Sequence, residues 1–592
     1  MSVCTMLFIA AITVSWSGTP ITAMNILAIE PITGKSHWNF MSALLRALTD
    51  SGHRVTAFTP ILDGERINYT DIDISKEIST LDVGIDSQFV MESFRKSTVM
   101  IPLVMNWTRC ICDIINEHPK MKDILNSDKS GYDLIIVERA ASECVTYVAA
   151  KLDVPIIFSS PSPLKTTIEY SLIGNNPNPA TVSHVMAYHS VPRTFLQRLE
   201  NSLFFAYSAF LSERKESEMK TNNPSKHDLV EPVKPSLVFV NTYYVTEAPR
   251  PFPPNVIQVG GIHLQPPKDD IIPADILEYI DNSPHEVIYF TFGSIVDMST
   301  LPDHIQNAYK DGLSQVPQRV LWKYEGEMKN KPPNVMTRKW FPQREILLHP
   351  KVKLFISHGG ISGVYEAIDA GVPVLGLPMF YDQPRNIENL VDAGMAISMD
   401  LLSVTREKLS NAINELINNE KYRINANIVS NCFKDRPMSP VSSVVYWTEY
   451  VHRHKSSTHL KSYAFDLTWY QYYLLDVFAV ILLLIVSTVY ITYKTLILLN
   501  YHYFSQTSQN FKIYFLHALN GEISGYLLFT EKIVFLPSTI GLEDCNANFV
   551  EKDFLIRPNI NLRRLNDEAV PSVFNFLKCL MKPVKENSNT KN

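Results

Sequence analysis

Two histidines of this chain stand where a parallel sheet would place reactive groups. His37 follows the apolar run Asn25–Glu30 and begins a helical pattern. Imidazole, with an unperturbed pKa of about 6.5, can take a proton from an alcohol near neutral pH. Glu138 directly follows another apolar run, and a carboxylate on the second ring nitrogen would fix the tautomer of the base. The alternatives are a helix-start histidine without chemistry and a salt-bridged surface carboxylate.

The second histidine, His358, ends a buried strand and is followed by Gly359 and Gly360. Glycines let the backbone approach a ligand closely, and the N-terminus of the helix that opens near Ser362 favours a phosphate group. Glu366 lies four residues further, on the same helix face, where its carboxylate can accept from adjacent sugar hydroxyls. The alternative is a tight strand–helix turn with no ligand.

Further polar groups follow in the same half of the chain. Ser294 ends one strand, and Trp340 and Gln343 follow another, where an indole can stack on a flat base and an amide can bind hydroxyls. Asp382 and Gln383 stand just before a helix, which suits several hydrogen bonds to a sugar. Taken separately, Trp340 could be a core residue and Asp382 a helix N-cap.

The elements that must position these groups alternate between short apolar runs and amphipathic stretches. This alternation predicts an α/β fold with two doubly wound domains, which face a cleft at the carboxyl ends of their strands and are joined by the proline-rich linker 249–254. Residues 160–230 are predicted to be irregular and to cap an acceptor pocket. The predicted strands are 26–29, 54–58, 134–137, 155–158, 287–292, 320–324, 352–356, 374–377 and 396–398. The predicted helices are 37–50, 142–152, 302–315, 362–370, 384–393 and 406–418.

The two ends of the chain suggest a membrane protein. An apolar run ending near Ala23 predicts a signal peptide, and Val477–Tyr493, extended to Leu499, predicts one transmembrane helix. The alternatives are a buried strand and a buried core helix. A signal peptide and one late span predict a type I protein, which fits the glycosylation sequons at Asn68 and Asn106.

Composition excludes several classes of protein. With 46% hydrophobic and 19% charged residues in 592, the chain has enough apolar side chains for large cores. A net charge of −6 without a basic block gives no indication of nucleic-acid binding. Seven cysteines make no disulfide scaffold, and Cys110 and Cys112 are too close to bridge comfortably. No Cys/His set has zinc spacing and no Asp-x-Asp motif stands in the predicted cleft, so no metal is expected.

The sequence closely resembles the signature of the UDP-glycosyltransferases, and it looks most like that of invertebrate members. The segments that carry this resemblance are Trp340–Gln343, His358–Glu366, the region of Gly371, and Asp382–Gln383. This resemblance implies the two-domain GT-B fold with Rossmann-like domains. It implies His37 as the base, with Glu138 where many members carry Asp. It also implies that Trp340 stacks on uracil and that Gln343 and Glu366 hold the ribose.

By the same resemblance, the diphosphate is held by Ser294, by His358 and by the amides near Gly359 and Gly360. Asp382 and Gln383 would hold the transferred sugar, and Ser362 stands where many members carry Asn. The only co-substrate implied is the UDP-sugar, which calls for no other cofactor.

The sequence therefore predicts an enzyme of the endoplasmic reticulum membrane, with lumenal catalytic domains and possible homo- or hetero-oligomers. It would transfer a hexosyl group, with glucose favoured and glucuronate possible, to a small lipophilic acceptor with inversion. The alternatives are a non-catalytic nucleotide-sugar-binding membrane protein and a transferase that acts on a lipid or a protein. The predicted domains are a signal peptide at 1–23, an acceptor-binding domain at 24–258, a UDP-sugar-binding domain at 259–455, a juxtamembrane segment at 456–473, a transmembrane helix at 474–499 and a tail of unknown role at 500–592.

Overall fold

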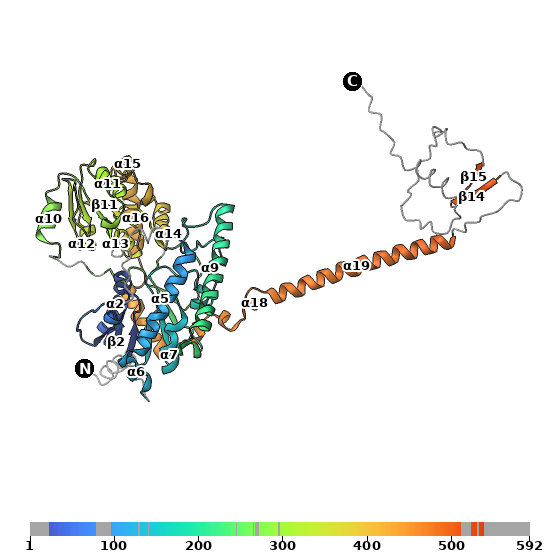
Figure 1. Cartoon of the computed structure of the whole chain (residues 1–592), viewed down its shortest axis with the longest axis horizontal. Coiled ribbons are helices and arrows are strands. Elements are labelled where there is room, and N and C mark those ends of the chain that lie inside the picture. Colours follow the sequence, from blue (N-terminus) through green and yellow to red (C-terminus); the bar gives the residue numbers. More distant parts are fainter. Residues whose placement is uncertain are drawn as a thin grey trace, which may run out of the picture. The chain divides into compact units, whose positions relative to one another are not determined.

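The computed structural model describes most of the chain, and it divides into two compact units, Met1–Thr468 and Trp469–Asn592 (Figure 1). The described residues are 23–78, 96–127, 131–139, 141–243, 245–264, 266, 271–293, 297–455 and 457–510, with the strands at 523–529 and 532–537. The predicted signal peptide, Ser294 and most of the predicted tail lie outside these ranges.

The first sheet is parallel and has seven strands in the order β3-β2-β1-β4-β5-β6-β7. Its central strands are short runs of β-branched and other apolar residues that are buried on both faces, as in sheets covered by helices on both sides. Its strands are β1 (Asn25–Ile29), β2 (Arg54–Thr59), β3 (Tyr69–Asp73), β4 (Leu134–Glu138), β5 (Ile156–Ser160), β6 (Leu237–Val240) and β7 (Val256–Gln258).

Two sets of helices cover this sheet. One face packs against α2 (Lys35–Asp50) and α17 (Pro440–Arg453). Helix α17 comes after the second sheet in the chain and returns to the first. The other face packs against helices that include α5 (Ser97–Glu117) and α7 (Tyr147–Leu152). The remaining helices of this part are α3 (Ser75–Ile78), α6 (Pro119–Asn126), α8 (Glu169–Ile173) and α9 (Phe195–Asn222).

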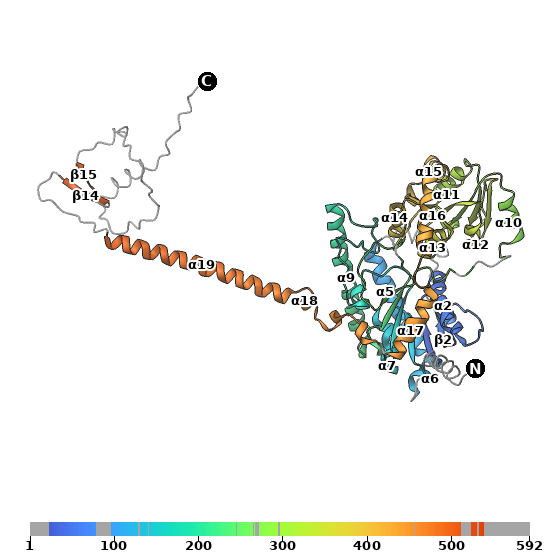
Figure 2. The same ribbon diagram turned by 180° about the vertical axis from the view of Figure 1, so that it is seen from behind.

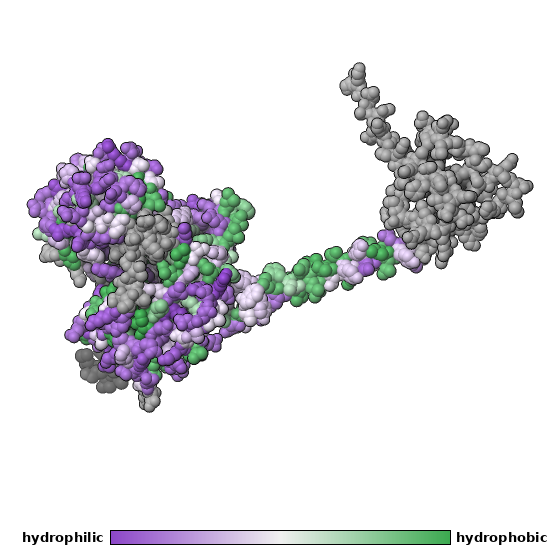
Figure 3. Space-filling model, in the orientation of Figure 1, coloured by the Kyte–Doolittle hydropathy of each residue, from purple (hydrophilic) through white to green (hydrophobic). Residues whose placement is uncertain are grey.

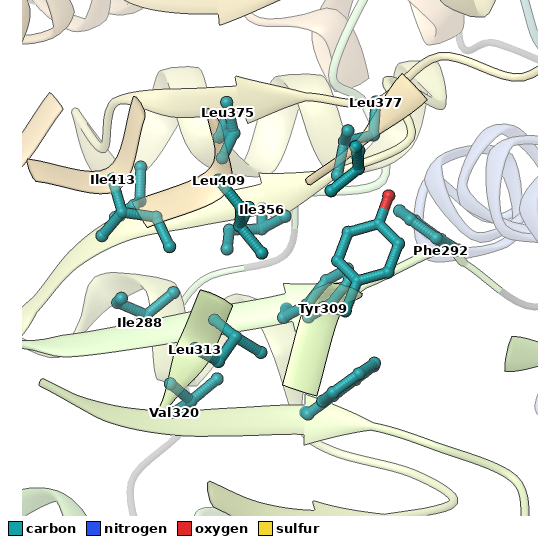
Figure 4. Packing of buried hydrophobic residues seen from close by; sticks show 14 of the residues in the cluster. Ile288, Phe292, Tyr309, Leu313, Val320, Ile356, Leu375, Leu377, Leu409 and Ile413 are labelled. Carbon is teal, nitrogen blue, oxygen red and sulfur yellow. The ribbon is translucent and has the colours of Figure 1, made fainter. Parts of the chain in front are cut away.

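The second sheet is also parallel and has six strands in the order β10-β9-β8-β11-β12-β13. Figure 4 shows one of its two faces, where Ile288 and Ile356 from the strands pack against Tyr309, Leu409 and other helix residues. Its strands are β8 (Val287–Thr291), β9 (Arg319–Lys323), β10 (Val335–Arg338), β11 (Val352–Ser357), β12 (Val374–Gly376) and β13 (Ala396–Ser398).

The helices of the second sheet also form two layers. The face of Figure 4 is covered by α11 (Asp303–Leu313) and α15 (Arg406–Asn418). The other face carries α10 (Ala274–Asp281), α12 (Gln343–Leu348), α13 (Ile361–Ala370), α14 (Gln383–Asp392) and α16 (Glu420–Lys434). The two sheets with helices on both faces confirm the predicted α/β fold of two Rossmann-like domains.

Some predictions about local structure were wrong. Residues 160–230 are not irregular throughout, because they contain the 28-residue helix α9. The strands β3, β6, β7 and β10 were missed; β3 and β10 are edge strands and β7 has only three residues. Cys112, which was considered only against its neighbour Cys110, forms a disulfide with Cys144 and so joins α5 to the turn before α7.

The second unit contains a long apolar helix. The unit begins with the short helix α18 (Trp469–Tyr472), and the long apolar helix is α19 (Leu475–Asn510). A strand pair follows, with β14 (Ile523–Phe529) and β15 (Lys532–Pro537). Within α19, Leu475–Tyr503 has a mean hydropathy of 2.4 and no buried share, which makes it a candidate membrane span. Thr98–Glu117 in α5 is also long and apolar enough to span, but it packs in the core of the first unit.

Candidate active site

The predicted base and its partner meet at the switch point of the first sheet. β1 and β4 are hydrogen-bonded neighbours with Ile29 opposite Val137, so the groups that follow them emerge side by side at the carboxyl edge. Nδ1 of His37, in the first turn of α2, lies 2.9 Å from both carboxylate oxygens of Glu138. The structure therefore brings these two predicted site residues together, with Nδ1 as the ring atom that contacts the carboxylate.

Glu138 is buried, and its other partners were not predicted. Glu30, the residue after β1, is buried beside it, and the Glu138 charge adds to burial in raising the pKa of Glu30 well above its usual value. The Lys165 ammonium lies 3.6 Å from Glu138 and donates to the carbonyl of Arg139 at 3.0 Å. Burial alone would raise the pKa of Glu138, but His37 and Lys165 lower it, and the net direction is downward.

This arrangement keeps one negative charge behind the imidazole. The raised pKa of Glu30 favours its neutral form beside Glu138, while the Lys165 ammonium balances the Glu138 charge, so Glu138 can hold the Nδ1 proton of His37 and stabilise an imidazolium. A pair of unprotonated carboxylates would be too costly at this depth, because burial penalises each charge. The cluster can thus support general-base chemistry at Nε2 of His37.

The second histidine is enclosed by glycines. A Cβ atom on Gly360 would lie 2.5 Å from Nε2 of His358, and one on Gly293 would lie 2.8 Å from its ring. Gly359, the residue between His358 and Gly360, has φ +84°, a backbone conformation that residues with a side chain rarely adopt. Only glycines therefore leave room for the His358 ring against the backbone where β8 and β11 end.

His358 is neutral at physiological pH. Burial, together with Lys323, lowers its pKa to about 4, and its Nδ1 has no hydrogen-bond partner among the described residues. It can therefore offer one N–H donor to an anion, but no positive charge. The N-terminus of α13, whose first turn contains Ser362, supplies backbone donors, since Gly360 caps it without a side-chain bond.

Gln343 and Glu366 come together between α12 and α13, where the Gln343 amide donates to the Glu366 carboxylate. Burial raises the pKa of Glu366 to about 7, although Gln343 opposes this effect. Both side chains are predicted ribose ligands, and their contact shows that they can act on the same group.

Trp340 is not a core residue, since its side chain is 56% exposed. The ammonium of Lys35, the first residue of α2, lies 3.7 Å above its ring in a cation–π contact. Lys35 was missed because nothing in its sequence position indicates a contact with the second sheet. A base that stacks on Trp340 must either displace this ammonium or use the opposite ring face.

Asp382 and Gln383 mark the start of α14. Asp382 stands at the N-cap position, as the alternative had it, but its side chain makes no cap bond and accepts from Asn386 at 2.8 Å. Burial raises the pKa of Asp382, and the hydrogen bond from Asn386 and the charge of Arg385 oppose this rise. The side-chain oxygen Oε1 of Gln383 accepts from the backbone N–H of Met379 at 2.9 Å, which leaves the side-chain NH2 group of Gln383 to donate.

Ser294 lies outside the described residues, so its predicted role is not placed. Among the described residues no three His, Cys, Asp or Glu side chains gather where a metal ion could be held. A hollow of about 660 Å³ opens at Glu325, Met328 and Lys339, and none of the predicted ligand residues lines it.

The state of Glu366 predicts a pH-dependent stability. Its pKa is about 7 in the folded chain against an ordinary 4.5, so its stabilising contribution is present below pH 4.5 and is lost as the pH rises through 7. Glu366→Gln is therefore expected to gain about 3 kcal/mol relative to the parent chain between pH 4 and pH 8. Thermal unfolding of the full chain at both pH values measures the gain. The exposed Glu407→Gln is the control, and an equal difference at both pH values would contradict the assignment.

The chain matches known proteins over most of its length. The family model described as UDP-glucoronosyl and UDP-glucosyl transferase matches residues 26–510. UDP-glucosyltransferase 2 of Dactylopius coccus is 36% identical over 81% of this chain and 94% of its own length. UDP-glucuronosyltransferase 2C1 of Oryctolagus cuniculus is 33% identical over 81% of this chain and 98% of its own length.

A solved structure, described as that of the glycotransferase of kitacinnamycin, has 15% identity and a TM-score of 0.48 over 73% of this chain and 99% of that chain. The family match, from residue 26 to residue 510, extends across both sheets and the candidate span. This chain belongs to the UDP-glucoronosyl and UDP-glucosyl transferase family and is a glycosyltransferase that moves a sugar from a UDP-sugar to an acceptor.

Proposed function

We propose that the chain transfers a hexosyl group from a UDP-sugar to a hydroxyl of a small lipophilic acceptor, with glucose as the favoured sugar. His37 acts as the base: Nε2 takes the acceptor proton while the acceptor oxygen attacks the anomeric carbon, and UDP leaves. The observation that carries this proposal is the 2.9 Å contact of His37 with the buried Glu138. A protein that only binds nucleotide sugars would have no use for this pair.

We propose that the donor lies along the carboxyl edge of the second sheet. Uracil stacks on Trp340, the ribose hydroxyls bind Gln343 and Glu366, and the diphosphate binds His358 and the amides near Gly359 and Gly360. Ser294 and Ser362 add hydroxyl contacts to the phosphates, while Asp382 and Gln383 bind the sugar. Since His358 is neutral, backbone donors at α13 carry most of the phosphate binding. No Asp-x-Asp motif stands among the proposed donor ligands, which supports a reaction without a metal, and unchanged turnover with EDTA would test this.

One base on one side of the anomeric carbon, and the absence of a carboxylate nucleophile in the proposed roles, support a single displacement with inversion. An α-linked donor would then give a β-linked product. NMR of the product from UDP-glucose and a phenol reads the anomeric configuration, and an α-glycoside would rule the scheme out. Parallel reactions with UDP-glucuronate decide between the donors, which the names of the relatives leave open.

We place the catalytic unit in the lumen of the endoplasmic reticulum, with a signal peptide at 1–23 and Leu475–Tyr503 as the single span. The Cys112–Cys144 disulfide supports an oxidising compartment. The proposed domains remain 24–258 for the acceptor and 259–455 for the donor. Glycosidase sensitivity of Asn68 and Asn106 in microsomes tests the orientation, because a cytoplasmic unit would carry no glycans.

Trp340→Ala is expected to weaken UDP binding about 10- to 100-fold, because stacking of a base on an aromatic ring contributes about 1–3 kcal/mol. The turnover number at saturating donor should change little, since the indole lies at the end of the donor far from the transferred sugar. Calorimetric titration with UDP measures the loss. Trp469→Ala, which removes another exposed indole, is the matched control. Equal UDP affinity of the two variants would show that uracil does not stack on Trp340.

A further inference from the structure

An ammonium covers the indole on which uracil is proposed to stack. Nζ of Lys35 lies 3.7 Å from the centre of the Trp340 ring, and no carboxylate pairs with Lys35 among the described residues. Trp340 belongs to the half of the first unit that carries the second sheet, and the surface of this half is mainly hydrophilic in Figure 3. A cation over an exposed indole strengthens an equilibrium only about two- to fivefold, so the ammonium can leave the ring readily.

The contact joins the two halves of the first unit close to the proposed base. Lys35 is the first residue of α2 and His37 is the third, so their Cα atoms lie about 5 Å apart. Trp340 lies between β10 and α12, and Figures 1 and 2 show α2 on the side of the first sheet that faces α12 and α13. A donor that reaches from Trp340 to His37 therefore passes beside the side chain of Lys35.

The proposed ligands of the diphosphate carry no positive charge. His358 is neutral at physiological pH, because burial, together with the charge of Lys323, lowers its pKa to about 4. Lys323 is itself compensated by an ion pair with Glu325. Arg344 of α12 is likewise compensated by Asp369, at 2.7 Å. A diphosphate at this site therefore has a use for a cation that is not already paired.

The side chain of Lys35 can move while the helix stays in place. Trp38, Phe40 and Met41 are buried and anchor the first turns of α2 in the core. Lys35 is exposed, and its ammonium stands on a flexible stem of four carbons. The ammonium can therefore exchange the indole for another partner without a rearrangement of the two halves.

We propose, on the basis of the donor position proposed above, that Lys35 is a donor-binding residue: uracil displaces its ammonium from Trp340, and the ammonium then binds the diphosphate. A charge-assisted hydrogen bond to phosphate replaces the weaker cation–π contact. During transfer the anomeric C–O bond breaks with its electron pair on UDP, while the acceptor oxygen forms the new bond and its proton passes to His37. The charge that UDP gains then lies next to Lys35, which stabilises the leaving group.

The test compares UDP with uridine, two ligands that share uracil and ribose but differ in charge. Calorimetric titration of the full chain in detergent measures the affinity for UDP, and displacement of UDP measures that for uridine. Lys35→Met removes the charge and keeps the length of the stem, whereas Lys35→Arg keeps the charge. Lys339→Met is the matched control, because Lys339 is an exposed lysine next to Trp340 that lines the hollow at Glu325.

Lys35→Met is expected to lower the preference for UDP over uridine at least about tenfold, because UDP loses a hydrogen bond to a charged group. Uridine should bind at least as tightly as before, up to about fivefold more tightly, since it no longer has to displace the ammonium. Lys35→Arg should retain most of the preference, and Lys339→Met all of it. Melting temperatures equal to that of the parent chain verify that the variants are folded.

Two results would overturn the role of Lys35. An equal change of UDP and uridine affinity in Lys35→Met would mean that the ammonium never reaches the diphosphate. An equal loss of preference in Lys339→Met would mean that only the general surface charge matters. Trp340→Ala tests the uracil position separately, because it should weaken both ligands by the same factor; unchanged affinities there would contradict the proposed donor site itself.

Discussion

His37→Ala is expected to lower kcat by about 10²- to 10⁴-fold, the range of a positioned general base, while UDP binds as tightly as before. The loss follows from the geometry at the end of β1, where the imidazole lies 2.9 Å from the buried Glu138 carboxylate. Without it the acceptor hydroxyl keeps its proton as it attacks. Initial rates with UDP-glucose and a phenol, together with UDP titration, separate chemistry from binding.

The partner residue provides the control for this prediction. Glu138→Gln keeps the shape of the side chain but removes the charge that stabilises the imidazolium, so a large loss in kcat is expected again. Glu138→Asp keeps the charge on a shorter side chain and should retain much more activity than the glutamine variant. A His37→Ala enzyme with parental kcat would exclude His37 as the base and would favour a role in binding alone.

Much of the fold could be predicted because its signals are local. The nine predicted strands lie in the two sheets, within one or two residues of the observed ends, since central parallel strands are continuous apolar runs between helices. The edge strand β3, with the sequence Tyr-Thr-Asp-Ile-Asp, has no such run. Helix α9 was missed for a different reason, because its apolar residues face outward and its polar residues face the core.

The site divides in the same way. The carboxyl ends of β1, β4 and β11 place His37, Glu138 and His358 at the two switch points, which strand order alone can indicate. Lys165 lies far along the chain from Glu138 and has no motif around it, so only the folded loop after β5 reveals their 3.6 Å approach. The same is true of Lys35 above Trp340, where the contact joins opposite halves of the first unit.

Lys165 occupies a position where its charge is needed and costly at once. Burial lowers the pKa of this lysine, and Glu138 opposes the effect. In return the Lys165 ammonium compensates the charge of Glu138, which is entirely buried behind His37. Removal of one partner of a buried ion pair costs about 3–5 kcal/mol, because the other charge is left uncompensated.

Lys165→Met is therefore expected to destabilise the first unit by about 3–5 kcal/mol at pH 7. The pKa of Glu138 is lowered in the parent chain, so this group stabilises the fold above its ordinary 4.5, and the contribution is lost as the pH falls through its folded value. The deficit of the variant should accordingly be full at pH 7 and smaller at pH 4, where the carboxylate that has lost the ammonium can take up a proton. Lys461→Met is the matched control, since Lys461 is partly buried and donates to the carbonyl of Lys234 at 3.0 Å, as Lys165 does to that of Arg139. The free energy of unfolding of both variants is measured at the two pH values. A loss of stability in Lys165→Met that is equal at pH 4 and pH 7 would mean lost packing. A loss that follows the ionisation of Glu138 would mean that the lysine holds the carboxylate charged behind His37.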